Sequence, residues 1–332
     1  MQEFKKIWRF KLKRCDKRNI AFSNNRLFIT SGNILLCFNS KGICWSRKIH
    51  ATFYRDPYCD VSISALDAAD GYVVVGTNFM DGKLYLLNED GKLLWEHQFA
   101  TIASLGWRPE DVTAIRIKRP YIAVGTEFTN EYLYVYTIHR KRVFEKRIKG
   151  RVEDISFMDN RLIVGSDSHL YIFNLTGKNE YIVDVPAKKV VVLDNLIFVV
   201  NSYGVFAFKP SHKATIKKYW SIEIDFKDID FCPVSSGIFL ALENQLYSIS
   251  RNGDFIWDRE FDEPVNSIFF DETVRRIYVG MDGEIEILTS SGKSVGRVDI
   301  DGKVVKIGRM SGIVVLEQNE SYESLTLKKI VF

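Results

Sequence analysis

The side chains that could carry catalysis are few and scattered. The five histidines show neither an H-E-x-x-H pattern nor the paired spacing of metal ligands. They are His50, His97, His139, His169 and His212. Asp167-Ser168-His169 holds the residue types of a hydrolytic triad, but we interpret it as a turn between strands. Acidic pairs such as Asp228/Asp230 and Asp282/Glu284 are expected to cap turns or to offset neighbouring Arg and Lys. No catalytic residue, metal or cofactor is therefore predicted.

Two runs of basic residues, within 5–18 and within 140–151, could contact phosphate groups. Both fall mainly on strands expected to be outermost in their sheets, where Lys and Arg face solvent and protect an edge. The net charge of +4 is also mild for a nucleic-acid-binding protein. RNA binding through the basic outer strands is therefore an alternative, and solvated strand faces are the favoured explanation.

A third set of side chains is typical of protein interfaces. Long connections between expected strands carry aromatic, Met and Arg residues, which are enriched among interface anchors. They are Phe53, Tyr54, Arg55, Tyr58, Phe79, Met80, Trp107, Arg108 and Phe128. Thr77-Asn78-Phe79 and Thr126-Glu127-Phe128 echo one another, which places similar Phe residues on neighbouring repeats. These residues are predicted to bind a protein or peptide partner; the alternative is that they pack under their own loops as additional core.

A repeat that runs along the whole chain must position these residues. Its mark is a Leu-Tyr-like pair in a short strand, and successive copies lie 35 to 49 residues apart, the period of a four-stranded propeller blade. The pairs are Leu35-Leu36, Leu84-Tyr85, Leu133-Tyr134, Leu170-Tyr171, Val205-Phe206, Leu246-Tyr247 and Ile285-Glu286, with a degenerate copy near Leu325. We predict an all-β, eight-bladed β-propeller of four-stranded antiparallel blades, with seven blades as the alternative. The expected blades are approximately 17–49, 61–99, 112–149, 152–185, 188–224, 227–261, 265–300 and 303–332 plus 4–12.

Turns and large aromatic residues recur at fixed places in the repeat. Asp90-Gly91 and Asn252-Gly253 are strong hairpin signals before the fourth strand. That strand carries a Trp in four blades, which suits packing between adjacent sheets. The residues are Trp45, Trp95, Trp220 and Trp257. Residues 303–332 supply only three strands, so the segment 4–12, with Ile7-Trp8, is expected to pair with them and to close the ring.

The stretch from Gly82 to Trp95 resembles the repeat of the quinoprotein (PQQ-type) propeller superfamily, and Val112-Thr113-Ala114-Ile115 resembles the opening of a WD40 repeat. The resemblance implies a β-propeller over nearly the whole chain. Quinone-binding members of the superfamily carry an adjacent Cys-Cys pair beside the cofactor. This sequence has no such pair, so PQQ is not expected as a cofactor.

Composition fits one large domain. The 332 residues are 46% hydrophobic and 27% charged, and no Pro/Ser/Gly-rich linker divides them, so a single domain over 1–332 is expected. Residues 1–12 contain no apolar core of a secretory signal, and no apolar run is long enough for a membrane helix. The five cysteines are scattered, without C-x-x-C. These features predict a cytoplasmic protein that does not contact a membrane.

Several connections are longer than their counterparts in other repeats. They are the loops from Gly76 to Leu84 and from Gly125 to Leu133, and the segments 50–60 and 100–111. In antiparallel blades these connections emerge on one face, and loops on a rigid scaffold are where binding sites are built. The sequence therefore predicts a non-catalytic interaction scaffold that binds a protein or peptide partner on the face bearing the long loops of blades 1–3. The remaining alternative is an enzyme that uses the central channel for hydrolase chemistry or for quinone- or metal-dependent chemistry.

Overall fold

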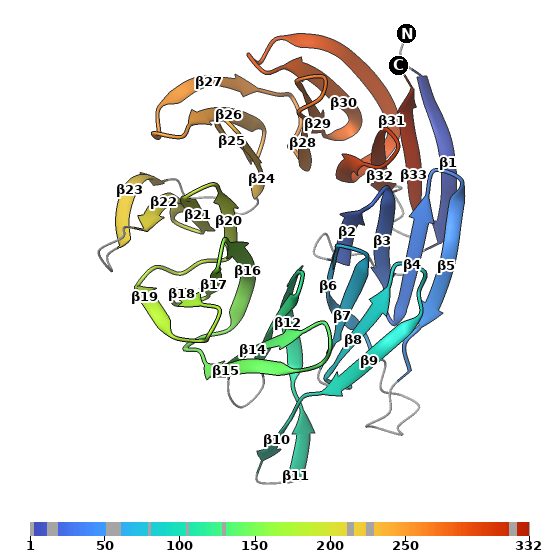
Figure 1. Cartoon of the computed structure of the whole chain (residues 1–332). Coiled ribbons are helices and arrows are strands. Elements are labelled where there is room, and N and C mark those ends of the chain that lie inside the picture. Colours follow the sequence, from blue (N-terminus) through green and yellow to red (C-terminus); the bar gives the residue numbers. More distant parts are fainter. Residues whose placement is uncertain are drawn as a thin grey trace.

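A computed structural model describes residues 3–11, 19–50, 61–78, 81–103, 106–127, 131–210, 216–223, 229–318 and 324–331. Strands β1 to β33 make up its regular structure and form a ring of sheets around a central axis (Figure 1). Within these residues there is no helix with the length and apolar character of a membrane span.

Six of the sheets have four antiparallel strands, each in sequence order from the axis outward. The first three are β2 (Ile20–Ser23), β3 (Arg26–Ser31), β4 (Ile34–Asn39) and β5 (Gly42–Lys48); β6 (Ile63–Ala69), β7 (Tyr72–Thr77), β8 (Lys83–Asn88) and β9 (Leu93–Gln98); and β12 (Asp111–Lys118), β13 (Tyr121–Glu127), β14 (Tyr132–Thr137) and β15 (Arg142–Arg147). The next three are β16 (Val152–Met158), β17 (Arg161–Ser166), β18 (Leu170–Asn174) and β19 (Asn179–Val183); β20 (Lys189–Leu193), β21 (Leu196–Asn201), β22 (Gly204–Pro210) and β23 (Ile216–Glu223); and β24 (Ile229–Val234), β25 (Gly237–Leu242), β26 (Gln245–Ser250) and β27 (Phe255–Glu260). The predicted propeller of four-stranded antiparallel blades is confirmed by this arrangement.

The seventh sheet corrects the expected number of eight separate blades. It has seven strands, in the order β1-β33-β32-β31-β30-β29-β28, so the ring contains seven sheets. Its strands are β28 (Ser267–Asp271), β29 (Arg276–Gly280), β30 (Asp282–Thr289), β31 (Ser294–Arg309), β32 (Ile313–Gln318), β33 (Ser324–Val331) and β1 (Glu3–Lys11). The cause lies in β31, in which Lys303 pairs with Asp282 of β30 and also with Gln318 of β32. The ladder with β30 is interrupted by a bulge at residues 300–302 and resumes at Lys303, which both ladders share, so the hydrogen-bonded sheet is continuous.

The two ends of the chain meet in this seventh sheet. β1 pairs antiparallel with β33 from Glu3 opposite Val331 to Lys11 opposite Ser324. The predicted pairing of the N-terminal segment with the C-terminal strands is therefore present. Residues of β3 and β4 form one buried cluster with residues of β31, β32 and β33, which joins the first sheet to the last.

Adjacent sheets lock together through aromatic residues on their outer strands. Each of the four predicted Trp residues donates its indole N–H to a turn carbonyl of the next sheet. The pairs are Trp45 with Glu89, Trp95 with Ile138, Trp220 with Arg251 and Trp257 with Ser290, at 2.8 to 3.1 Å. Gly292 has φ +79°, and a Cβ there would lie 2.9 Å from Trp257 Cε3, so the turn needs glycine to receive the indole. The predicted inter-sheet role of these Trp residues is confirmed.

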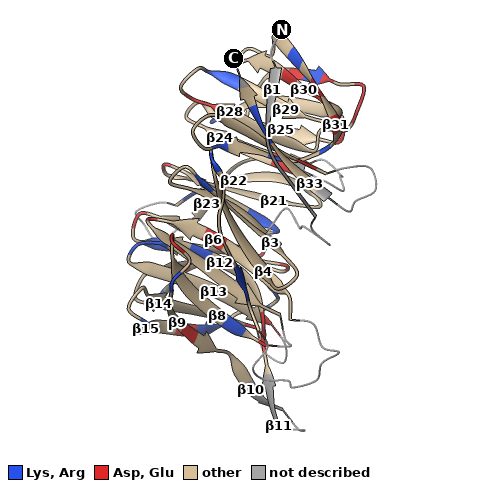
Figure 2. Cartoon of the chain, turned by 90° about the vertical axis from the view of Figure 1, so that its right-hand side faces the viewer, with Lys and Arg blue, Asp and Glu red and all other residues tan. Residues whose placement is uncertain are grey.

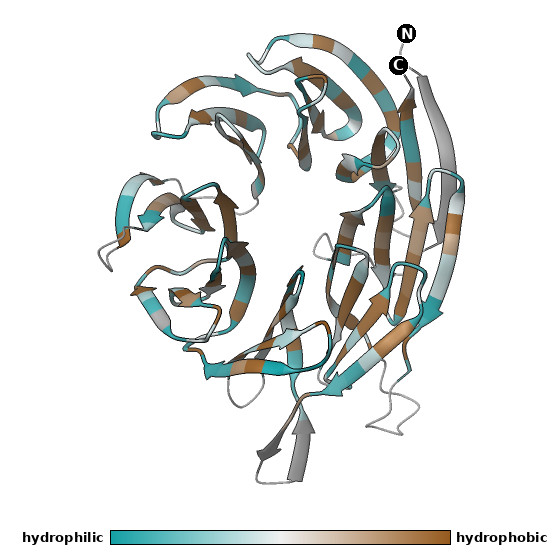
Figure 3. Ribbon diagram, viewed as in Figure 1, coloured by the Kyte–Doolittle hydropathy of each residue, from teal (hydrophilic) through white to brown (hydrophobic). Residues whose placement is uncertain are grey.

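The second strands form the inner core, and the outer strands face water. β3, β7 and β17 are almost entirely buried, whereas β15 is mostly exposed. Figure 3 shows the same gradient, with hydrophilic residues frequent on the outer strands. Gly76 ends β7 against β12, where a Cβ would lie 2.2 Å from Val112 Cγ1. This close approach holds neighbouring inner strands together and fixes the positions of the side chains that face the axis.

Candidate functional site

The predicted partner-binding residues fall largely on connections that the structure does not describe. Phe53, Tyr54, Arg55, Tyr58, Phe79, Met80 and Phe128 lie outside the described residues. Trp107 and Arg108 lie on β11 (Gly106–Pro109), for which the backbone is described. The predicted role of all nine residues stays a prediction, and the surrounding residues show how their connections are anchored.

A two-stranded hairpin stands out from the ring between β9 and β12. β10 (Ala100–Ala103) pairs antiparallel with β11, with Ile102 opposite Trp107, and together they form a sheet of their own (Figure 1). With the ring seen edge-on, the hairpin projects from its outer rim, away from the axis (Figure 2). The sequence predicts only a long connection here, although β-branched Thr101-Ile102 followed by Gly106-Trp107 carries a short hairpin signal.

The base of this hairpin is bonded to the loop that joins β7 to β8. Phe99 N donates to Gly82 O at 2.8 Å, and Glu110 N donates to Phe99 O at 3.2 Å. Gly82 has φ +59°, and a Cβ there would lie 2.8 Å from Glu110 N, so the two backbones touch. The Gln98 amide also donates to Gly82 O at 3.1 Å. Two of the predicted long connections therefore lie side by side.

A buried Thr-carboxylate contact fixes each loop. Thr77 Oγ1 lies 3.3 Å from Asp81 Oδ2, which also accepts the Tyr85 hydroxyl at 2.6 Å. Thr126 Oγ1 donates to Glu110 Oε2 at 2.6 Å, and burial raises the pKa of Glu110 above its usual value. Thr77 and Thr126 thus make similar contacts, while the predicted similarity of Phe79 and Phe128 stays a prediction, because both lie outside the described residues. We call Thr77, Asn78, residues 81–82, residues 98–103, residues 106–111 and Thr126 the loop platform.

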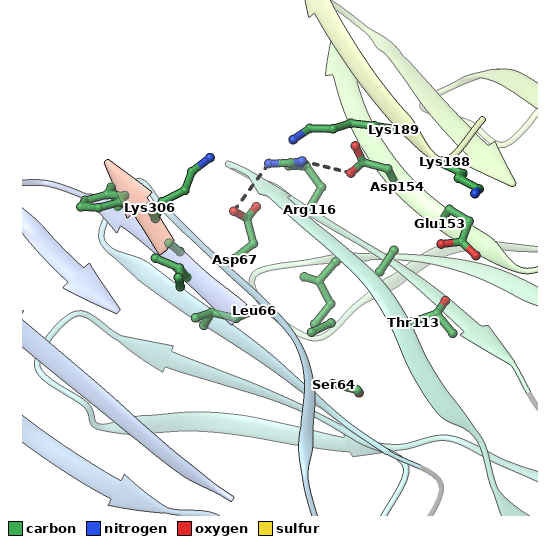
Figure 4. A pocket seen from close by; sticks show the side chains of 16 residues that line it. Ser64, Leu66, Asp67, Thr113, Arg116, Glu153, Asp154, Lys188, Lys189 and Lys306 are labelled. Atoms are coloured by element: carbon green, nitrogen blue, oxygen red, sulfur yellow. Dashed lines mark hydrogen bonds and ion pairs between the residues drawn. The ribbon is translucent and has the colours of Figure 1, made fainter. Parts of the chain in front are cut away.

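A second candidate site is a cavity of about 400 Å³ on the propeller axis. Inner strands β2, β6, β12, β16, β20 and β31 contribute to its lining. Arg116 lies between two carboxylates, with Nη2 at 3.2 Å from Asp154 and Nη1 at 3.7 Å from Asp67 (Figure 4). Burial alone would lower the pKa of Arg116, but Asp67 and Asp154 outweigh it and raise that pKa.

Three Asp residues on inner strands bond to the backbone of the following sheet. Asp67 accepts Ile117 N–H at 2.8 Å, and Asp154 accepts Val190 N–H at 3.0 Å. The third, Asp230, accepts Ile268 N–H at 2.8 Å and lies 3.3 Å from Lys306 Nζ. We call Asp67, Asp154 and Asp230 the inter-sheet carboxylates. Their repeated bonding is structural, and sequence reasoning missed it because each partner belongs to another repeat.

The triad-like trio does not form a nucleophile. Ser168 Oγ donates to Lys149 O at 2.7 Å, so its proton is not directed to the His169 ring, whose Nδ1 lies 2.8 Å from the same oxygen. The nearest acidic partner of His169 is Asp184, at 3.7 Å with a side chain 95% exposed. Across the described ranges, no group of three His, Cys, Asp or Glu residues could hold a metal ion.

One acidic pair and part of the second basic run form local ion pairs. Glu284 lies 3.8 Å from Arg297, and Asp282 lies 3.9 Å from Lys303. Arg142 bonds to Glu145 on β15, an outer strand that faces solvent. Of the acidic pair Asp228/Asp230, Asp228 lies outside the described residues.

Comparison with known proteins shows which solved structures share this architecture. Structural similarity extends to BamB from Moraxella catarrhalis, with TM-score 0.71 and 14% identity over 98% of this chain and 100% of that one. Sqt1 from Saccharomyces cerevisiae gives TM-score 0.72 and 11% identity, with 98% of each chain covered. A chain of the mitotic checkpoint complex gives TM-score 0.58 and 11% identity over 100% of this chain and 94% of that one. No curated protein sequence matches the chain.

At the level of sequence families, the model described as outer membrane protein assembly factor BamB matches residues 5–208, more than half of the chain. The match covers β1 and the repeats as far as β22, and it agrees with the PQQ-type resemblance of the segment from Gly82 to Trp95. The protein therefore belongs to this family of PQQ-repeat, WD40-like β-propellers.

Proposed function

We propose that the protein is a non-catalytic interaction scaffold that docks a protein or peptide partner on the loop platform and its projecting hairpin. The observation that carries the proposal is the convergence of two long connections, joined through Gly82, Phe99 and Glu110, at the base of a hairpin that extends beyond the ring. A rigid base lowers the conformational entropy lost when such loops bind a partner. The family description as an assembly factor supports the same class of function.

Pairing of β1 with β33 supports the rigidity that this proposal needs. We infer that it closes the ring, because the two strands share eight paired positions and the clusters of the first and last sheets merge. A closed propeller leaves no long sheet edge free and holds its loops in fixed relative positions. We also propose a cytoplasmic location, supported by the scattered cysteines and testable by cell fractionation.

The docking proposal is tested by replacing Phe79, Trp107 and Phe128 with Ala together. Because these aromatic residues are the proposed anchors, we expect the variant to lose its partner in affinity purification from native cells, with a melting temperature close to that of the wild type. The matched control is Phe255→Ala on β27, which removes an aromatic side chain that is 55% exposed on another sheet. Partner recovery that survives the triple substitution, or a large loss of stability, would contradict the proposal.

A further inference from the structure

Around the axial cavity, the acidic side chains have partners within the protein, whereas some of the basic side chains form no ion pair among the described residues. The inter-sheet carboxylates are occupied by backbone N–H groups and by basic side chains. Asp154, for example, accepts Ile155 N–H, Val190 N–H and Arg116 Nη2 at 2.9, 3.0 and 3.2 Å. The remaining acidic side chain in the lining, Glu153, lies 3.6 Å from Arg151 Nε. The acidic groups at the cavity are therefore committed to the propeller itself.

Basic groups at the same cavity are in excess. Arg116, Lys188, Lys189 and Lys306 line it, against Asp67, Glu153 and Asp154. Among the described residues, no ion pair within 4.0 Å involves Lys188 or Lys189, whereas Lys306 is shared with Asp230. Lys189 and Lys306 point toward one another across the opening (Figure 4). The ammonium groups of Lys189 and Lys306 thus face a common space, with N–H donors available for a ligand.

We propose that the axial cavity binds a small molecule that carries two or more carboxylate or phosphate groups. Oxyanions accept charge-assisted hydrogen bonds from ammonium and guanidinium groups, and these are the strong hydrogen bonds of binding sites. A cavity of about 400 Å³ lies within the usual size range of small-molecule sites. Three cationic side chains, Arg116, Lys189 and Lys306, line one space, so a ligand with more than one anionic group can bond to several of them at once. Lys189 provides recognition, and Arg116 and Lys306 provide the positive field around it; Lys188 lines the cavity with its ammonium group on the side of Glu153 (Figure 4).

Titration calorimetry of the full chain at low salt tests this site with tripolyphosphate and, separately, citrate. We expect one molecule bound per chain, and the stronger of the two probes identifies phosphate or carboxylate as the preferred group. The double variant Lys188→Ala/Lys189→Ala should weaken binding about tenfold, the effect of losing the charge-assisted bond from Lys189. It should remain folded, because Lys306 still pairs with Asp230, although the loss of Lys189 removes one of the two cations that hold the pKa of Asp230 low.

The matched control is Lys217→Ala/Lys218→Ala on β23, which lowers the net charge equally at exposed positions of an outer strand. We expect this control to bind like the wild type. Three results would overturn the proposal: failure of both probes to bind the wild type, equal loss of binding in the control, or unchanged binding in the Lys188/Lys189 variant. A retained melting temperature in both double variants shows that the comparison concerns the site and not the fold.

Discussion

Two Asp side chains at equivalent depth near the axis show opposite electrostatic behaviour. Burial raises the pKa of Asp67, despite the lowering effect of Arg116 and of the Ile117 amide. Burial acts on Asp230 in the same direction, but Lys306 and Lys189 outweigh it and hold the pKa of Asp230 below its usual value. The ionised form of Asp230 therefore stabilises the fold at neutral pH, and this contribution is lost as the pH falls through its folded-state pKa.

Replacing Lys306 with Met should make the ionised form of Asp230 destabilise the fold at neutral pH. With only Lys189 left to offset burial, Asp230 favours the protonated form more strongly, so we expect the free energy of unfolding at pH 7 to fall by about 3 kcal/mol, the lower end of the cost of breaking a buried ion pair. The deficit should shrink as the pH is lowered toward 4, because protonation of Asp230 removes the unpaired charge. Urea unfolding of wild type and variant at pH 7 and at pH 5 measures the difference.

Lys303→Met is the control for that experiment. Lys303 lies 3.9 Å from Asp282, and both side chains are largely exposed, so its loss should cost less than about 1 kcal/mol. A deficit in the Lys306 variant that does not change with pH would show that the side chain acts by packing and not by charge.

The candidate residues were predictable to different degrees. The four Trp positions recur once per repeat, so their place between sheets follows from spacing alone. The axial charges do not recur: Arg116 and Asp154 are 38 residues apart and Asp67 and Ile117 are 50 apart. Only the curvature of the ring brings them together, so pattern reasoning within one repeat could not have found the cavity.

At the scale of elements, a Trp and the turn of the next sheet form the recurring joint. Trp257→Phe removes the indole donor to Ser290 O and some buried surface, so we expect a loss of about 1–2 kcal/mol in the free energy of unfolding. Gly292→Ala should destabilise in the same direction, since φ there is +79° and the methyl group would press on the indole. Chemical unfolding of each variant gives the values.

Phe255→Leu, at an exposed position of the same strand as Trp257, should change stability by less than about 0.5 kcal/mol. If Trp257→Phe also left the free energy of unfolding unchanged, the contact between the Trp and the turn of the next sheet would contribute no stability. The regular spacing of the Trp residues would then describe their position only.

Two elements differ from what their sequences indicated. The segment after β9 was read as a loop and contains β10 and β11, because four-residue strands are too short for alternation to distinguish them. The opposite difference occurs between the expected blades 265–300 and 303–332. Asp301 and Gly302 lie in a bulge inside β31, since Lys303 pairs both with Asp282 and with Gln318 and keeps the sheet continuous.

At the scale of the whole molecule, the most important contact is the pairing of β1 with β33. Removing residues 1–11 deletes β1 and leaves the outer edge of β33 without its partner. Unpaired edges recruit other chains, so we expect a lower melting temperature and concentration-dependent self-association. Light scattering coupled to size-exclusion chromatography measures the second effect. A truncated chain that remains monomeric with an unchanged melting temperature would show that β1 is dispensable.

Sequence reasoning recovered the architecture better than the site. Repeat length, turn residues and Trp spacing are local signals that act in every copy, and they were sufficient for the propeller and for the pairing of its ends. The loop platform depends on contacts between non-repeated segments, such as Gly82 against Glu110. Such contacts leave no periodic trace, so only the general position of the long connections could be predicted.

The meeting of β1 and β33 has a consequence for engineering. Glu3 lies opposite Val331, so a short peptide could join these ends and new ends could be opened between other sheets, giving a circularly permuted protein. Ser294–Arg309 is the segment where such a cut should fail, because β31 belongs to two ladders at once and its interruption would sever both.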